Sequence, residues 1–121
     1  MSEESVALSK VFAKIRSQQN QRGVVYQDMT LGPRMAYANQ CVLALSVEVS
    51  ELASSWPFAS WKTTPVDREN IEREIIDILF FTVNIADCFN IQPLDLVERF
   101  EVVLANNQRR IDNGEHKEVE F

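Results

Sequence analysis

Apolar residues recur along the chain with the spacing of amphipathic helices. Between about residues 4 and 20 they follow an i, i+3, i+4, i+7 pattern at Leu8, Val11, Phe12 and Ile15. The three glycines and four prolines fall almost entirely between such periodic segments, and no pair of segments has the turn of a strand hairpin. The pattern predicts an all-α chain.

Capping residues place the ends of the expected helices. Pro33 suits the first turn of the second helix, Asp67 suits the N-cap of the third, and Pro93 opens the fourth. Asn113-Gly114 suits a left-handed C-terminal cap. The four helices are expected over about residues 4–20, 33–55, 67–89 and 93–113. We therefore expect a four-helix bundle that forms one domain over residues 1–121.

The third expected helix is apolar almost all the way round. Its apolar residues are Ile75, Ile76, Ile78, Leu79, Phe80, Phe81, Val83, Ile85 and Ala86. A membrane span is a poor explanation, because Asp77 and Asn84 interrupt a run shorter than the roughly 20 residues needed. Such a helix needs cover on every side. A second copy of the chain is the simplest source of that cover, so we expect a homodimer or a dimer of dimers.

Composition and charge narrow the class of protein. The chain has 121 residues, 45% hydrophobic and 25% charged, which is typical of one globular domain. Its 12 basic and 18 acidic side chains give a net charge of −6, which disfavours binding to a nucleic-acid polymer. Cys41 and Cys88 lie in apolar runs, so we expect buried free thiols in a reducing compartment. The first residues lack the pattern of a signal peptide, and we expect a cytoplasmic protein.

Two pairs of acids lie on apolar faces of the second and third helices. Glu48 and Glu51 form one pair, Glu74 and Asp77 the other, and a spacing of three puts both members of a pair on one face. The face of the first pair also carries Cys41. Glu69, Glu72 and Asp87 point away from these pairs, toward a different face of the third helix. We therefore expect the four carboxylates of the two pairs to point inward.

Inward carboxylates need compensation, because an unpaired buried charge costs several kcal/mol. Buried ion pairs are one solution, but Arg and Lys are scarce on the matching faces. Hard divalent cations are the other, since magnesium prefers oxygen ligands. A di-iron bundle would need Glu-x-x-His pairs, and the single histidine, His116, lies in the tail.

The acids and two flanking segments resemble one enzyme superfamily. Glu48-x-x-Glu51 followed after 22 residues by Glu74-x-x-Asp77 resembles the signature of the all-α nucleoside triphosphate pyrophosphohydrolases, which include MazG, the dimeric dUTPases and the dCTP pyrophosphatases. Residues 47–62, VEVSELASSWPFASWK, and residues 107–117, NQRRIDNGEHK, resemble two segments of the dimeric dUTPases. The likeness covers about residues 35–117. A Lys-Asn pair expected shortly before the second segment is absent, since valine and leucine occupy positions 103 and 104.

The resemblance implies a fold, an activity and a cofactor. It implies a magnesium-dependent pyrophosphohydrolase that cleaves a (deoxy)nucleoside triphosphate, with dUTP as one candidate, to the monophosphate and pyrophosphate, and so clears unwanted nucleotides. Glu48, Glu51, Glu74 and Asp77 would hold Mg²⁺, with Mn²⁺ as a substitute. Glu51 would also accept the proton of the attacking water.

Four further residues are candidates for substrate binding. The Trp61 indole can stack on a base, and the Lys62 ammonium can contact phosphate. Asn107 is a polar residue in an apolar row of the fourth helix, and Arg110, one turn on, suits bidentate phosphate recognition. An ion pair with an acid of the same site is the alternative role for Arg110.

Three questions stay open at this point. A dCTP preference or a promiscuous MazG-like activity is an alternative to dUTP as the substrate. Related dUTPases use a glutamine at the end of the first helix to read the base, and the sequence does not decide between Gln18 and Gln19. The alternative function is a non-enzymatic helical module, for dimerisation or regulation, whose inward acids bind a metal structurally. Added nucleotide would stabilise only the enzyme.

Overall fold

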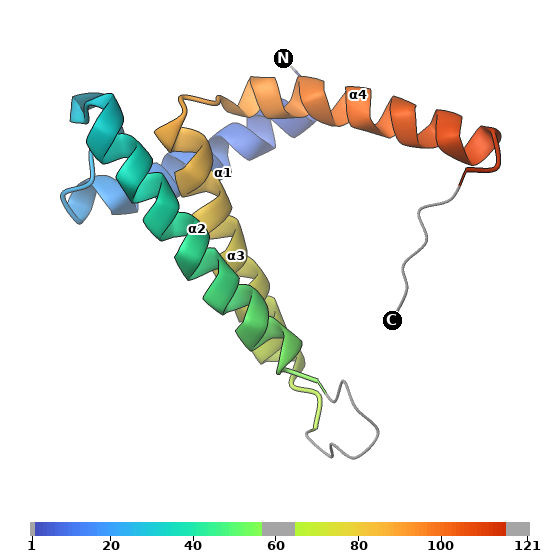
Figure 1. The fold of residues 1–121 in the computed structure, drawn as a ribbon, viewed down its shortest axis with the longest axis horizontal. Helices are drawn as coiled ribbons and strands as arrows, with labels where there is room; N and C mark the ends of the chain where they lie inside the picture. The colour runs from blue at the N-terminus through green and yellow to red at the C-terminus, as the bar shows by residue number, and fades with distance from the viewer. Residues whose placement is uncertain (1, 57–64, 116–121) are drawn as a thin grey trace.

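The computed structural model describes residues 2–56 and 65–115, and within them the regular secondary structure is all helical, without strands (Figure 1). The elements are α1 (Glu3–Gln21), the short 3-10 helix η1 (Tyr26–Asp28), α2 (Leu31–Ala53), α3 (Arg68–Cys88) and α4 (Pro93–Asp112). The prediction of an all-α chain with four main helices is confirmed.

Most of the predicted helix ends are found with the expected chemistry. The Asp67 side chain accepts a hydrogen bond from the backbone N–H of Asn70 at 3.2 Å, which caps α3. Pro93 is the first residue of α4, and Gly114 after its end has a φ of +74°. α2 begins two residues before Pro33, which still lies in the first turn, where the missing N–H has no helical partner to lose.

α2 and α3 form the antiparallel pair that carries the acids (Figure 1). At one end, the amide nitrogen of Asn70 donates to the hydroxyl of Ser55 at 3.0 Å. Near the other end, Ala38 of α2 and Cys88 of α3 are buried in one cluster together with Tyr26. The pairing therefore brings the middle of α2 against the middle of α3.

α1 packs across α3 through the main apolar cluster. Phe12 and Ile15 of α1 contact Val83 and Ala86 of α3, and all four are buried. The apolar surface of α3 is only partly covered by this contact, since Ile75 is 51% exposed. None of the described helices is long and apolar enough to cross a membrane. Both cysteines are free and buried, as predicted.

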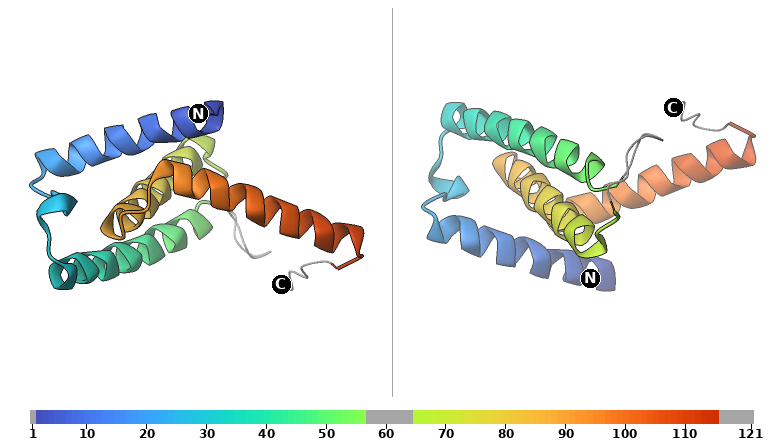
Figure 2. Two further views of the ribbon diagram at one scale, coloured as in Figure 1. Left: turned by 90° about the horizontal axis from the view of Figure 1, so that it is seen from above. Right: turned by 90° about the horizontal axis from the view of Figure 1, so that it is seen from below.

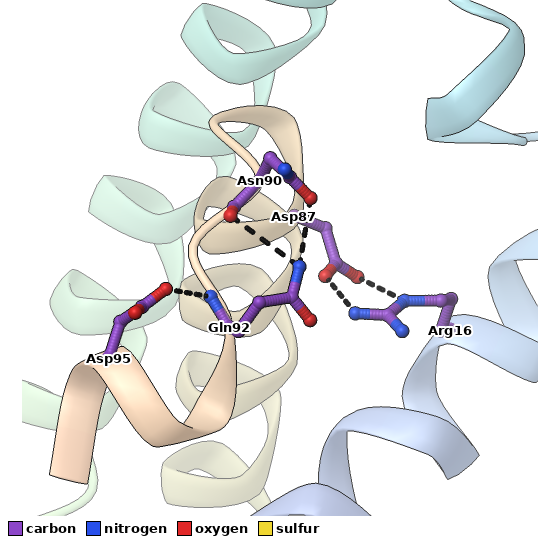
Figure 3. Close-up of polar contacts among 5 residues, drawn as sticks. All are labelled: Arg16, Asp87, Asn90, Gln92 and Asp95. Atoms are coloured by element: carbon purple, nitrogen blue, oxygen red, sulfur yellow. Dashed lines mark hydrogen bonds and ion pairs between the residues drawn. The ribbon is translucent and has the colours of Figure 1, made fainter.

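An ion pair joins α1 to the end of α3 (Figure 3). The sequence pattern placed Asp87 on an outward polar face, and this is wrong: Asp87 is 6% exposed. The Arg16 guanidinium donates to its two carboxylate oxygens at 2.6 and 3.3 Å. Burial of Asp87 is possible because α1 supplies this partner from 71 residues away.

The turn between α3 and α4 sets the direction of the last helix. Asn90 has a φ of +54° in this turn, and its side-chain oxygen accepts from the Gln92 amide at 2.8 Å. The backbone N–H of Gln92 donates to Asp95 at 2.9 Å (Figure 3). α4 contacts α1, with Leu96 packed on the α1–α3 core, and its C-terminal half extends away from the other helices (Figures 1 and 2).

Candidate metal-binding site

Three of the four predicted acids gather between α2 and α3. Glu48 of α2 and Glu74 and Asp77 of α3 each offer a carboxylate oxygen, and these oxygens lie within 4.8 Å of one another. All three residues are half-buried. The antiparallel register of the two helices brings the residues together, and the spacing of three puts Glu74 and Asp77 on one face of α3. We call these three residues the acidic cluster.

Two oxygens of the acidic cluster have no hydrogen-bond partner in the protein. Oε2 of Glu48 and Oε2 of Glu74 are buried and have no hydrogen-bond partner. Over residues 2–56 and 65–115 the ion pairs are Arg16 with Asp87 and Arg68 with Glu72, so no cation is paired with the cluster there. The alternative of buried ion pairs is therefore not realised in the described part of the chain.

The pKa of Glu48 is raised from its ordinary value of 4.5 to about 7. A hydrogen bond with the Glu74 carboxyl is the largest cause, followed by burial, and then by the negative charges of Glu51, Glu74 and Asp77. A proton shared by two carboxylates reduces the repulsion between them, as a bound cation would. The unsatisfied oxygens and the all-oxygen donor set fit a hard divalent cation such as Mg²⁺.

Glu51 lies beside the acidic cluster but is not part of it. It is exposed, whereas the sequence pattern placed it inward with the other three. Its charge still acts on Glu48, one helical turn away on α2. Glu51 also lines an open groove of about 630 Å³. The other residues of this groove are Ser46, Val47, Ser50, Ser54, Ser55, Pro65, Asp67 and Asn70. Glu51 thus faces solvent at the border between the acids and this groove.

Of the four predicted substrate-binding residues, the two that the structure describes are not brought to the acidic cluster. Asn107 and Arg110 are exposed in the C-terminal half of α4, which extends away from α2 and α3 (Figure 1). Within the described residues Arg110 forms no ion pair with an acid of the site. Trp61 and Lys62 lie outside the described residues.

A second group of polar residues is buried where α1, α2 and η1 meet. Gln19 is 4% exposed, and its amide donates to the Tyr37 hydroxyl at 2.9 Å. The rings of Tyr37 and Tyr26 lie 5.9 Å apart. Of the two glutamines that the sequence left open, Gln19 is buried and Gln18 is exposed.

Asn84 of α3 is a buried polar residue to which the sequence reasoning assigned no role. It is 4% exposed, and its Oδ1 has no hydrogen-bond partner. The available signal was a polar amide inside the most apolar run of the chain.

Comparison with known proteins adds one finding to this geometry. A family model described as dUTPase matches residues 10–117. The chain belongs to the dUTPase family. It is the all-α, dimeric dUTPase-like family that the acids and flanking segments resembled, so that resemblance is confirmed. The searches of curated proteins and of solved structures found no match.

Membership of the dUTPase family indicates which class of reaction the acidic cluster could serve. The match includes both acid pairs and the segment with Asn107 and Arg110. Assignment to this family indicates a nucleotide pyrophosphohydrolase, an enzyme that acts on nucleoside triphosphates. Carboxylates are the groups with which a protein holds the metal ions that accompany phosphates.

Proposed function

We propose that this chain is a magnesium-dependent pyrophosphohydrolase that cleaves a (deoxy)nucleoside triphosphate to the monophosphate and pyrophosphate. Its role would be to remove unwanted nucleotides, and dUTP is the first substrate to test. The observation that carries the proposal is the acidic cluster, with two buried oxygens that no protein group satisfies. Membership of the dUTPase family supports the substrate class.

The four acids have distinct proposed roles. Glu48, Glu74 and Asp77 would hold Mg²⁺ directly, with Glu51 as the fourth ligand at the exposed edge. When bound, the cation neutralises phosphate charge and makes water a better nucleophile. Mn²⁺, which also accepts oxygen ligands, would serve as a substitute.

Glu51 is also the proposed catalytic base. It is exposed beside the cluster, so water reaches it freely. The water oxygen forms a bond to phosphorus as the bond to the leaving phosphate oxygen breaks, and the proton of the water passes to the Glu51 carboxylate. The products are the nucleoside monophosphate and pyrophosphate.

Substrate contacts are proposed for Trp61, Lys62, Asn107 and Arg110. The indole would stack on the base, and the two cations would bind phosphate oxygens. Since α4 carries Asn107 and Arg110 away from the acids of its own chain, we propose that they serve the site of a second copy.

Exposed apolar side chains on α4 support this arrangement. Phe100 is 58% exposed, Ile111 56% and Leu104 46%. Apolar groups of this size on one helix favour burial in an interface. A homodimer would bury them, and a twofold interface would complete two sites at once.

The test is magnesium-dependent release of pyrophosphate from a panel of nucleoside triphosphates. Glu51→Gln and Asp77→Asn should each abolish release while helical content, measured by circular dichroism, is unchanged. Glu69→Gln is the matched control, because Glu69 is an exposed acid near the start of the same α3. Full turnover in both site variants would overturn the proposal.

A further inference from the structure

Burial of the Asn84 side chain costs free energy, and no hydrogen bond to its Oδ1 in the described residues offsets that cost. Its side chain is buried, and the side-chain oxygen Oδ1 accepts no hydrogen bond. A buried acceptor without a donor destabilises a fold, and a leucine of similar size would avoid that cost. A position of this kind calls for a ligand that supplies the missing donor.

Asn84 lies on the same side of α3 as the acidic cluster. Asp77 precedes it by seven residues, which is two helical turns, or about 10 Å along the axis. Cys88 follows it by four residues, one further turn along the same face. α2 runs antiparallel beside this face, with Glu48 level with the acids and Ala38 beside Cys88. One continuous contact between α2 and α3, which we call the seam, therefore joins the acids to Asn84.

Unsatisfied polar atoms occur at both ends of this seam. At the acid end they are Oε2 of Glu48 and of Glu74. At the other end, besides Oδ1 of Asn84, the Tyr26 hydroxyl and Nε of Arg34 are buried without partners. Tyr26 packs against Cys88, and another nitrogen of Arg34 donates to the Tyr26 carbonyl oxygen at 2.7 Å. The acid end therefore holds two acceptors without donors, and the far end holds an acceptor and donors that are not paired.

We propose that Asn84 is a specificity-determining residue that hydrogen-bonds the base of the nucleotide whose phosphates lie at the acidic cluster. The inference rests on the proposed function, and it adds the group that distinguishes one base from another. The Asn84 amide offers an acceptor beside a donor. A pyrimidine with an N–H next to a carbonyl, such as uracil, presents the complementary pair.

The base reaches Asn84 between α1 and α2. Both helices rest mainly on other elements, α2 on α3 and α1 on α3 and α4. The hydrogen bond from Gln19 to Tyr37 is the side-chain hydrogen bond that joins α1 to α2 in the described residues. The incoming base takes the place of this contact, and the freed Gln19 amide and Tyr37 hydroxyl then line its path.

The experiment compares Asn84→Leu with the unaltered protein on several substrates. The value of kcat/KM is measured with Mg²⁺ for dUTP, dCTP and dTTP, and for 2′-deoxyribose 5′-triphosphate, which lacks a base. The leucine variant should lose about ten- to a hundredfold for the best nucleotide, since a base left unpaired in a buried site forfeits a hydrogen bond. Its kcat/KM for the base-free triphosphate should be unchanged. Thr82→Val, which removes an exposed hydroxyl from the same helix, should alter neither.

Each outcome bears on one of the two proposals. If the unaltered protein releases pyrophosphate from no triphosphate, the proposed function fails. If it does so and Asn84→Leu keeps the same ratios of kcat/KM among the bases, the role of Asn84 is overturned while the function stands. The leucine variant should also unfold at an equal or higher temperature, because it removes the unsatisfied acceptor. Should it fail to fold, Asn84→Ser, which is too short to reach the base, must show the same loss of discrimination.

Discussion

Glu48 and Glu74 face each other from two antiparallel helices, and each keeps one carboxylate oxygen buried without a hydrogen-bond partner. Together with Asp77, their oxygens lie within 4.8 Å of one another. Two acids held this close cannot both ionise without repulsion, so the pair retains a proton until a cation replaces it.

Magnesium should stabilise the protein through the acidic cluster. A ligand that binds only the folded state raises the free energy of unfolding, by about 2.7 kcal/mol when present at a hundred times its dissociation constant. We expect the melting temperature to rise with Mg²⁺ and to rise further with a non-hydrolysable dUTP analogue. Asp77→Asn should lose both increments, and Glu69→Gln should keep them. A further rise with nucleotide separates an enzyme from a module that binds metal alone, for which Mg²⁺ would give the whole effect.

The metal-free protein should become less stable as pH rises from about 4.5 to about 7. The pKa of Glu48 is raised from 4.5 to about 7 in the folded state, so in this range the folded state binds more protons than the unfolded state. The contribution of Glu48 is fully present below pH 4.5 and is lost as pH passes through about 7. Urea unfolding at several pH values measures the trend, and Glu48→Gln should flatten it. If the stability of the metal-free protein rises through this range and Glu48→Gln removes that rise, the raised pKa of Glu48 is contradicted.

Magnesium affinity should follow the opposite trend. The proton held near Glu48 must leave before a cation binds, so binding should strengthen as pH rises through about 7. Isothermal titration at pH 6 and pH 8 with Mg²⁺ measures both the affinity and the release of protons. Affinity independent of pH would place the ion away from Glu48.

Loss of the Arg16–Asp87 pair should destabilise the fold strongly. Asp87 has a side chain only 3% exposed, so Arg16→Ala leaves a buried carboxylate without its cation. Breaking such a pair costs about 3 kcal/mol, at the lower end of the range for buried pairs because the Arg16 side chain is itself 33% exposed. The matched control is Arg68→Ala, which removes an exposed pair with Glu72 and should cost less than about 0.5 kcal/mol. Urea unfolding measures both free energies of unfolding. An equal decrease for Arg16→Ala and Arg68→Ala would contradict the burial of Asp87.

The proposed shared site can be tested by mixing inactive subunits. Arg110→Ala should be inactive because it lacks a phosphate contact, and Asp77→Asn should be inactive because it lacks a metal ligand. In a random mixture, half of the dimers would be mixed and each of these would have one intact site, which restores about a quarter of full activity. If α4 instead served its own chain, the mixed dimers would contain no intact site and activity would not return.

An exposed charge on α4 should separate the subunits. Phe100→Asp places a carboxylate in the apolar row of this helix, and sedimentation should then show the monomer mass. Helical content should be kept, because Phe100 is 58% exposed within its own chain. A monomeric mass for the unaltered protein at micromolar concentration would contradict the expected dimer.

Local sequence signals were sufficient for the helices and for most of the acidic cluster. Asp67, Pro93 and Gly114 act on the backbone within a few residues, so their effect on helix ends can be predicted from the sequence. The spacing of Glu74 and Asp77 fixes their shared face in the same way. Glu51 was expected to point inward with them, yet it is exposed, because the boundary of a helix face depends on the neighbouring helix and not on spacing alone.

The pattern of hydrophobic and polar positions did not predict contacts between residues that are far apart in the sequence. Asp87 reads as a surface acid until Arg16 is known to lie opposite it. The orientation of α4 depends on one turn in which Asn90 adopts a φ of +54°, a conformation that the hydrophobic pattern does not encode. The unsatisfied state of Asn84 likewise depends on which donors its neighbours place near it.

The direction of α4 has a consequence for how the protein behaves on dilution. In the proposed dimer, a helix that leaves its own chain with Phe100 and Leu104 uncovered would make the completion of each site depend on an encounter between two chains. Turnover per chain would then rise with protein concentration and level off once nearly all chains are paired. The amount of enzyme made by a cell would thereby set both the number of active sites and the fraction of them that work.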